Sequence, residues 1–330
     1  MTTQQPPTQT PAHKADLVLE GGGVKGIGLA GAVLALDAAG YRFSRVAGTS
    51  AGAIAAALIA ALNARGRPIS ELRDILATVD YPKFESGNVI TEAAGLLTHM
   101  GLHDGDYLVE WLGDALEQIG ATRFGDLRLD DSGADANLTD AQRYTLIVDV
   151  SDISRGRCVH LPWDYPAYGR HDIDDELIVH AVRASMAIPF FFRPVRFDAP
   201  ETDFGDQHFT ASKITWVDGG MLSNFPVEVF DRTDGSAPRW PTIGIKLSAR
   251  EFVVAPANEI HGAASEAFAA LHTLINNDER YYVPGDKANR TIFVDNAGIS
   301  ATDFGITKEQ QDTLFANGRS AAQAYLQTAR

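Results

Sequence analysis

Two strand–glycine–helix units follow one another near the start of the chain. Their strands are expected over Ala15–Glu20 and Phe43–Ala47, and their helices over Gly26–Ala39 and Ile54–Ala64. Both helices are apolar on nearly all faces, which is typical of helices that cover a parallel sheet. We therefore predict an α/β fold in which a mostly parallel central sheet is covered on both sides.

The rest of the chain continues to alternate strands with helices. Further strands are expected at Tyr144–Val150, Arg157–Leu161, Ile214–Val217, Thr242–Lys246 and Thr291–Val294. Further helices are expected at Glu71–Val79, Tyr107–Gln118, Asp174–Ala187 and from Thr307 to about Gln327. The helix at Asp174 would open with the acidic turn that a helix dipole favours, and the helix at Thr307 would open with a capping box formed with Gln310.

No internal repeat and no clear linker divides the sequence. Residues 1–13 are polar and proline-rich, without the apolar centre of a signal peptide, and are expected to form a disordered tail. The acidic stretch Asp126–Asp140 is expected to be a surface loop. We predict a single domain over residues 14–330, with its motifs between about 16 and 246 and a C-terminal strand and helices over about 247–330.

Composition narrows the possible partners. The chain has 43 acidic and 28 basic residues, a formal net charge of −15, which argues against nucleic acid and against electrostatic docking on anionic lipid. Any membrane contact is therefore expected to be transient, local and apolar. The longest apolar run, Ala51–Leu62, is too short to span a bilayer, so we expect a cytoplasmic protein, with signal-independent secretion and the oligomeric state left open.

Metal and cofactor signals are weak. Cys158 is the single cysteine, which excludes an intrachain disulfide and a cluster of cysteine ligands. The nine histidines show no H-E-x-x-H or similar spacing. We therefore expect neither a metal nor a diffusible cofactor.

The second glycine turn, Gly48-Thr49-Ser50-Ala51-Gly52, is a G-x-S-x-G at a strand-to-helix junction. Glycines are needed there because the serine of such a turn sits on a tight, strained backbone where side chains would clash. The serine would also stand at the positive end of the following helix. The pattern favours a nucleophile at Ser50, against an ordinary glycine turn with an incidental serine.

The first glycine turn, Gly21-Gly22-Gly23-Val24-Lys25-Gly26, also lies between a strand and a helix. A dinucleotide site would need an acidic residue near the end of the next strand, but Arg45-Val46-Ala47-Gly48 stands there. Glycine amides that point at an anion would instead suit an oxyanion hole, with a structural turn as the remaining alternative. Lys25 could contact a lipid phosphate or simply be solvated.

A third motif, Asp218-Gly219-Gly220, follows the strand expected at Ile214–Val217. A serine hydroxyl needs a base within hydrogen-bond reach, and burial would raise the pKa of an aspartate enough to serve. The same tripeptide also suits a plain turn. A triad with a histidine such as His261 or His272 stays open, although both lie in an Ala/Leu-rich helical stretch.

The three motifs, in this order, resemble the patatin-like phospholipase family. The resemblance extends from about Asp16 to Lys246 and includes Gly105–Leu108, Ala184–Pro189 with Phe190–Phe192 behind it, and Asn224–Pro226. It implies a three-layer α/β/α sandwich and a Ser-Asp dyad without histidine, with Ser50 as nucleophile, Asp218 as base and the amides of Gly22 and Gly23 as the oxyanion hole. Glu20 stands before the glycine run, where the family often has Asp.

The activity implied is a serine acyl hydrolase of the phospholipase A or lysophospholipase type, acting on a lipid or other ester. Its acyl groove would be built from Gly95–Met100, Met186–Phe192 and Leu222–Phe225. The alternatives are an esterase with a Ser-Asp-His triad and a non-catalytic lipid- or phosphate-binding protein of similar fold.

Overall fold

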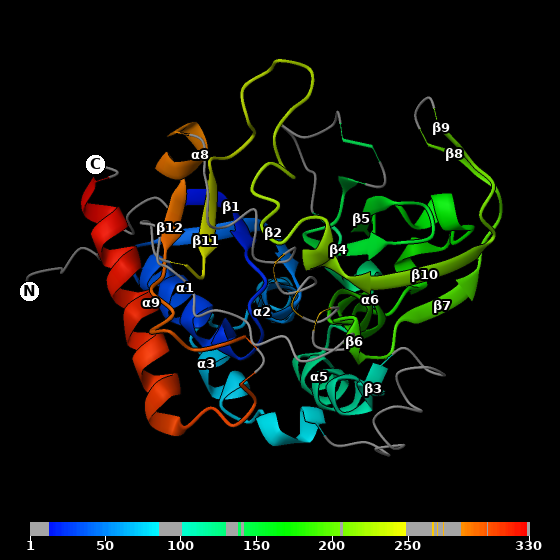
Figure 1. Cartoon of the computed structure of the whole chain (residues 1–330). Helices are drawn as coiled ribbons and strands as arrows, with labels where there is room; N and C mark the ends of the chain where they lie inside the picture. Colours follow the sequence, from blue (N-terminus) through cyan, green and yellow to red (C-terminus); the bar gives the residue numbers. More distant parts are fainter. Residues whose placement is uncertain are drawn as a thin grey trace, which may run out of the picture.

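The computed structural model of the chain describes residues 13–85, 101–129, 138–139, 142–204, 207–248, 285–301 and 303–328, with single helical positions at 266, 269 and 273. Its centre is an eight-stranded sheet with the order β12–β11–β1–β2–β4–β10–β7, to which β5 adds on β4 (Figure 1). The strands are β1 His13–Leu19, β2 Tyr41–Thr49, β4 Leu146–Asp152, β5 Arg157–Leu161, β7 Val195–Asp198, β10 Lys213–Asp218, β11 Thr242–Lys246 and β12 Thr291–Phe293.

Strand direction changes at β4. The five strands from β12 to β4 are parallel to their neighbours, whereas β10, β7 and β5 pair in antiparallel fashion. The predicted mostly parallel sheet flanked by helices is thus confirmed. Its antiparallel part was not predicted.

Helices flank this sheet. The main helices are α1 Ile27–Ala38, α2 Ala51–Ala64, α3 Glu71–Leu76, α5 Asp106–Ile119, α6 Ile178–Ser185, α8 Gly285–Asn289 and α9 Lys308–Thr328. Short 3-10 turns are η1 Gly23–Gly26, η2 Tyr81–Glu85, η3 Phe124–Leu127, η5 Tyr165–Tyr168, η6 Ile173–Asp175 and η7 Gly219–Met221. Two minor sheets pair β3 Gly101–His103 with β6 Phe190–Phe192, and β8 Thr202–Phe204 with β9 Gln207–Phe209.

Both faces of the sheet are apolar, which accounts for the nearly continuous hydrophobic strands. On one face, Leu17, Val46 and Val148 pack with α1, α2 and α6 in the main core. On the other face, Val18, Ala47 and Ile147 pack with Phe230, and Trp163, Phe225 and Val229 lie against this second cluster. Successive residues of a strand point to opposite faces, so each strand contributes to both clusters.

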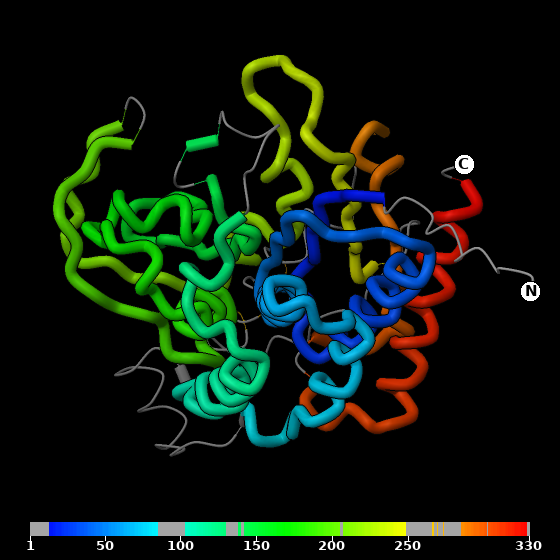
Figure 2. Tube along the Cα trace, turned by 180° about the vertical axis from the view of Figure 1, so that it is seen from behind, coloured from blue at the N-terminus to red at the C-terminus, as the bar shows by residue number. Residues whose placement is uncertain are grey.

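The last described helix, α9, packs on α1 beside the sheet. Helix α9, red in Figures 1 and 2, lies along α1, blue, in views from opposite sides. The capping box predicted for α9 is present, because Thr307 Oγ1 accepts the Gln310 N–H at 3.2 Å and Gln310 Oε1 accepts the Thr307 N–H at 2.8 Å.

Two local expectations need correction. The single helix predicted over Asp174–Ala187 is instead η6 followed by α6, because Leu177 is extended at φ −78° and ψ 129° and interrupts it. Asp174 therefore does not begin α6; its carboxylate pairs with Arg128 and accepts the Tyr144 hydroxyl at 2.8 Å. In addition, His13, assigned to the tail, is the first residue of β1.

Candidate active site

Ser50 occupies the sharp turn between β2, which ends at Thr49, and α2, which begins at Ala51. Its φ of 53° lies in the left-handed region that side chains disfavour, so the surrounding structure must hold it there. A Cβ at Gly48 would lie 2.3 Å from the Gly52 carbonyl oxygen, and one at Gly52 would lie 2.3 Å from the Leu19 oxygen. The turn is therefore possible only with glycine on both sides of the serine.

Asp218 reaches Ser50 because their strands approach β4 from opposite directions. Parallel pairing places Thr49 opposite Asp149, and antiparallel pairing places Asp218 opposite Val150. The end of β2 and the end of β10 thus meet across two adjacent residues of β4. The Ser50 hydroxyl donates to Asp218 Oδ2 at 2.8 Å.

The Asp218 carboxylate is 2% exposed. Burial raises its pKa to about 7, although the hydrogen bonds from the Ser50 hydroxyl and from the Gly220 N–H at 2.8 Å act in the opposite direction. A Cβ at Gly219 would lie 2.3 Å from the Asp149 oxygen, so glycine is required for this close approach to β4. The result is a carboxylate that is far more basic than a solvated one.

Two further residues hold the serine, and both come from the segment that ends α6. The Ser50 N–H donates to Ser185 Oγ at 2.8 Å, and the Ser185 hydroxyl donates to the Asp149 carbonyl at 2.6 Å. Met186 Sδ lies 3.4 Å from Ser50 Oγ. The sequence indicated Ala184–Pro189 through the family resemblance and Met186 as part of a predicted acyl-groove wall, but it did not predict the contacts of Ser185 and Met186 with Ser50.

The glycine loop lies against the serine, and a Cβ at Gly21 would be 3.2 Å from Ser50 Cβ. The Gly21 N–H is occupied, because it donates to the Asn224 carbonyl at 3.1 Å. Within the described ranges, the Gly22 and Gly23 amides have no protein acceptor. Gly26 allows η1 to pack on α2, since a Cβ there would lie 3.3 Å from Ala51 Cβ. Of the four glycines, Gly21 and Gly26 thus lie at close packing contacts, and the Gly21 N–H is already bonded and is not free to donate to an oxyanion.

An apolar pocket opens beside the turn, with about 470 Å³ of empty space including the part open to solvent. Gly23, Gly26, Ala51 and Met186 form its wall next to Ser50, and the remaining lining residues are Val24, Ile27, Ile54, Ala55, Leu76, Val79, Tyr81, Phe84, Trp111 and Phe304. The η1–α1 segment and helix α2 therefore contribute half of these residues, and α3, η2 and α5 contribute to the rest.

This pocket corrects the walls predicted from the sequence. Met186 is the one member of the predicted segments that lines the pocket, and Gly95–Met100 lies outside the described residues. Leu222 is 46% exposed, and Phe225 packs on the opposite sheet face, where Lys246 Nζ lies 5.5 Å from its ring.

The described residues place no histidine at Ser50 or Asp218 and include no membrane-spanning helix. His261 and His272 lie outside the described residues; among those described, no histidine bonds to Ser50 or Asp218. Over the same residues, none of the helices combines the length and hydropathy needed to cross a bilayer.

Comparison with known proteins agrees with the motifs. The family described as patatin-like phospholipase matches residues 17–231. The uncharacterized protein YqhO of Bacillus subtilis (strain 168) is 33% identical over 317 residues, which cover 94% of this chain and 97% of that protein. VipD from Legionella pneumophila shares the fold with a TM-score of 0.51 at 17% identity, over 97% of this chain and 67% of VipD.

A more distant likeness is to ExoU in its complex with SpcU from Pseudomonas aeruginosa. The TM-score is 0.45 at 17% identity, over 97% of this chain and 52% of ExoU. The family match and the fold confirm the resemblance inferred from the glycine loop, the G-x-S-x-G turn and the D-G-G motif. The chain belongs to the patatin-like phospholipase family.

Proposed function

We propose that this protein is a serine acyl hydrolase that cleaves carboxylic ester bonds of lipids through a dyad of Ser50 and Asp218. One observation carries the proposal: the Ser50 hydroxyl donates to Asp218 Oδ2 at 2.8 Å. Burial raises the pKa of this carboxyl to about 7, close to the value that suits a general base at neutral pH.

In the acylation step, Asp218 Oδ2 removes the hydroxyl proton while Ser50 Oγ attacks the ester carbonyl carbon. The carbonyl π electrons move to its oxygen, which becomes an oxyanion. The Gly22 and Gly23 amides would donate to this oxyanion, and the N-terminus of α2 adds a favourable dipole. One such donor typically contributes about 2.7–4 kcal/mol of transition-state stabilisation.

The tetrahedral intermediate then breaks down. Its bond to the leaving oxygen cleaves, the alcohol takes the proton held by Asp218, and the acyl group remains on Ser50. For deacylation, Asp218 accepts a proton from water as the hydroxide attacks the acyl carbon. The carboxylic acid leaves, and the proton returns from Asp218 to Ser50 Oγ, which restores the resting site.

The substrate follows from the surroundings of the serine. The apolar pocket lined by the η1–α1 segment, α2 and their neighbours suits an acyl chain. Lys25 is 7% exposed in the glycine loop, and no carboxylate pairs with it among the described residues. A lysine in this position, with no carboxylate partner among the described residues, would favour an ester that brings its own anion, such as a phospholipid or lysophospholipid.

The test is labelling by a fluorophosphonate together with hydrolysis of a short-chain chromogenic ester. We expect Ser50→Ala to lose the label and all turnover above background, because it removes the hydroxyl that is bonded to the proposed base. Asp218→Asn should lower kcat/KM by about 10²–10⁴-fold, the usual contribution of a general base. Ser70→Ala, at the exposed start of α3, is the control and should behave as wild type.

Each other outcome contradicts a specific part of the mechanism. Turnover by Ser50→Ala would exclude Ser50 as nucleophile. Labelling of Ser50 with full activity in Asp218→Asn would point to a histidine base. A wild-type protein that binds lipid but neither labels nor turns over ester would be a binding protein.

A further inference from the structure

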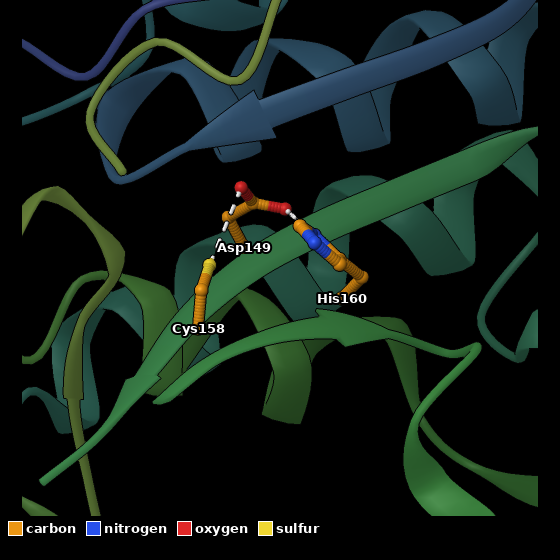
Figure 3. Close-up of side chains that lie close together, drawn as sticks. All are labelled: Asp149, Cys158 and His160. Atoms are coloured by element: carbon orange, nitrogen blue, oxygen red, sulfur yellow. Dashed lines mark hydrogen bonds and ion pairs between the residues drawn. The ribbon is translucent and has the colours of Figure 1, made fainter. Parts of the chain in front are cut away.

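Three potential metal ligands gather on β4 and β5, on strands that the hydrolytic mechanism does not use for its reacting groups. Asp149 lies on β4, and Cys158 and His160 lie two residues apart on β5 (Figure 3). Antiparallel pairing places His160 directly opposite Asp149 and Cys158 opposite Ser151. Because side chains alternate along a strand, these three point to the same face of the sheet.

Their ligand atoms are already close together. His160 Nδ1 is 2.8 Å from Asp149 Oδ1, Cys158 Sγ is 3.8 Å from Asp149 Oδ2, and the three ligand atoms lie within 4.8 Å of one another. In a tetrahedral zinc site with bonds of about 2.0–2.3 Å, ligand atoms are separated by roughly 3.3–3.8 Å. Small side-chain rotations would bring the three atoms to those separations.

Charge and access also suit a cation. The Asp149 carboxylate is fully buried, and its side-chain partners are the imidazole and the thiol. Asp164, which accepts the His160 backbone N–H at 2.9 Å, is a second carboxylate near the thiol, although its charge is partly offset by Arg157, whose guanidinium lies 3.2 Å from Asp164 Oδ2. The His160 side chain is 34% exposed, so the cluster can be reached from solvent.

We propose that Asp149, Cys158 and His160 bind a divalent zinc-type cation, with its fourth position left to water on the exposed side of His160. As the Sγ–metal bond forms, the thiol proton leaves to solvent. The carboxylate and the thiolate then balance the two positive charges of the metal. Zinc accepts this mixture of sulfur, nitrogen and oxygen ligands, whereas magnesium and calcium select oxygen alone.

The position of this site links it to the dyad through the backbone. The Asp149 carbonyl accepts the Ser185 hydroxyl, and Ser185 Oγ accepts the Ser50 N–H. A cation on Asp149 would therefore anchor the segment of β4 against which β2 and β10 both end. Binding to the folded chain alone would raise its stability as the cation concentration rises.

The test is a titration of the full-length, metal-stripped protein with Co²⁺, followed by absorption spectroscopy. Thiolate coordination produces a ligand-to-metal charge-transfer band in the near ultraviolet, and Cys158 is the single thiol in the chain, so the band reports this residue alone. We expect a band that saturates at one equivalent, with intense visible bands of four-coordinate Co²⁺, and displacement by Zn²⁺.

Variants identify the other ligands. Cys158→Ala should abolish the band, and His160→Gln should weaken Co²⁺ binding by at least about tenfold, since loss even of an indirect partner of a metal ligand costs 10–100-fold. His208→Gln is the matched control, because His208 Nδ1 lies 2.7 Å from Asp203 Oδ1 in an exposed pair. It should bind Co²⁺ as wild type does.

The proposal fails if the folded wild-type protein shows no charge-transfer band with excess Co²⁺. It also fails if His160→Gln retains the wild-type affinity. These spectra do not depend on hydrolysis, so the outcome is independent of the proposed enzymatic activity.

Discussion

In the proposed dyad the Asp218 carboxyl acts as the base in place of a histidine, and its burial explains how it can do so. A solvated aspartate is a weak base because water stabilises its charge. At 2% exposure this stabilisation is lost, so the carboxylate binds a proton far more readily. Basicity is therefore gained at the expense of folding stability, since the charged form is disfavoured inside the protein.

The pH dependence of catalysis should reveal this raised pKa. The base acts only when deprotonated, so we expect kcat/KM to rise with pH and to level off above an apparent pKa of about 7. The measurement is a pH–rate profile with a neutral ester. An acid limb near pH 4 would show that Asp218 is solvated in the free enzyme.

The folding stability of the protein should change with pH in the opposite direction to its activity. The folded-state pKa of Asp218 is raised above its unfolded value, so its favourable contribution is complete below about pH 4 and is lost as pH rises to about 7. The Asp218→Asn variant has no charge to bury, so it should not lose stability over this pH range. Each pKa unit corresponds to about 1.4 kcal/mol, so the variant should exceed wild type by a few kcal/mol at pH 8 but not at pH 4.

Urea unfolding at the two pH values provides the measurement. An equal stability difference at pH 4 and pH 8 would contradict a titrating, buried Asp218. The Asn side chain can still accept the Gly220 N–H and donate to Ser50 Oγ, so the hydrogen-bond pattern is kept.

For individual residues, the sequence predicted the site residues that lie within a contiguous motif. It did not predict those that strand pairing brings together from distant parts of the chain. Ser50 and the glycines around it form one contiguous string, and Asp218 stands in a recognisable tripeptide. Ser185 contacts Ser50 from 135 positions away, a proximity that no local pattern encodes. Cys158 and His160 show only a C-x-H spacing, and Asp149 joins them only when β4 and β5 pair.

Among the elements, helices α1 and α9 approach each other closely at glycines on both helices. A Cβ at Gly318 of α9 would lie 1.9 Å from the Gly28 carbonyl oxygen, and one at Gly31 of α1 would lie 2.1 Å from the Phe315 oxygen. Glycines on both helices thus allow their backbones to touch. This contact attaches the last helix of the chain to the first.

Gly318→Ala should therefore destabilise the protein by about 1–3 kcal/mol or more, the usual cost of overpacking, because the obstructing atom is backbone. Gly113→Ala in α5 is the control: nothing lies within 4 Å of its Cβ, and alanine should stabilise that helix by up to about 1 kcal/mol. Thermal unfolding compares the two variants. Equal stability would show that α9 can shift away from α1 without cost.

Most elements were predictable, but their arrangement was only partly so. Strands such as β11 and helices such as α9 follow from apolar patterns and capping residues. The antiparallel direction of β10 could not be predicted in this way, because the residues of a strand do not indicate the direction of the strand beside it. The start of α6 was predicted too early because Asp174 was interpreted as part of an acidic first turn. In the structure, the Asp174 carboxylate instead pairs with Arg128.

For the molecule as a whole, the net charge of −15 sets the behaviour at a lipid surface. We expect the Ser50→Ala variant, which leaves vesicles intact, to sediment less with anionic than with zwitterionic vesicles at low salt, because like charges repel. The difference should shrink at high salt as screening increases. Preferential binding to anionic vesicles would reveal a local cationic surface that outweighs the net charge.

The dyad joins two residues 168 positions apart, and the strand between them in space, β4, carries neither. A chain still being synthesised holds Ser50 early but cannot pair it with its base until β10 has emerged and added to β4. Contacts so distant in sequence form late in folding. If the proposed dyad is correct, hydrolysis is consequently a property of the finished fold, and a nascent or truncated chain that ends before Lys213 would leave the lipids around it intact.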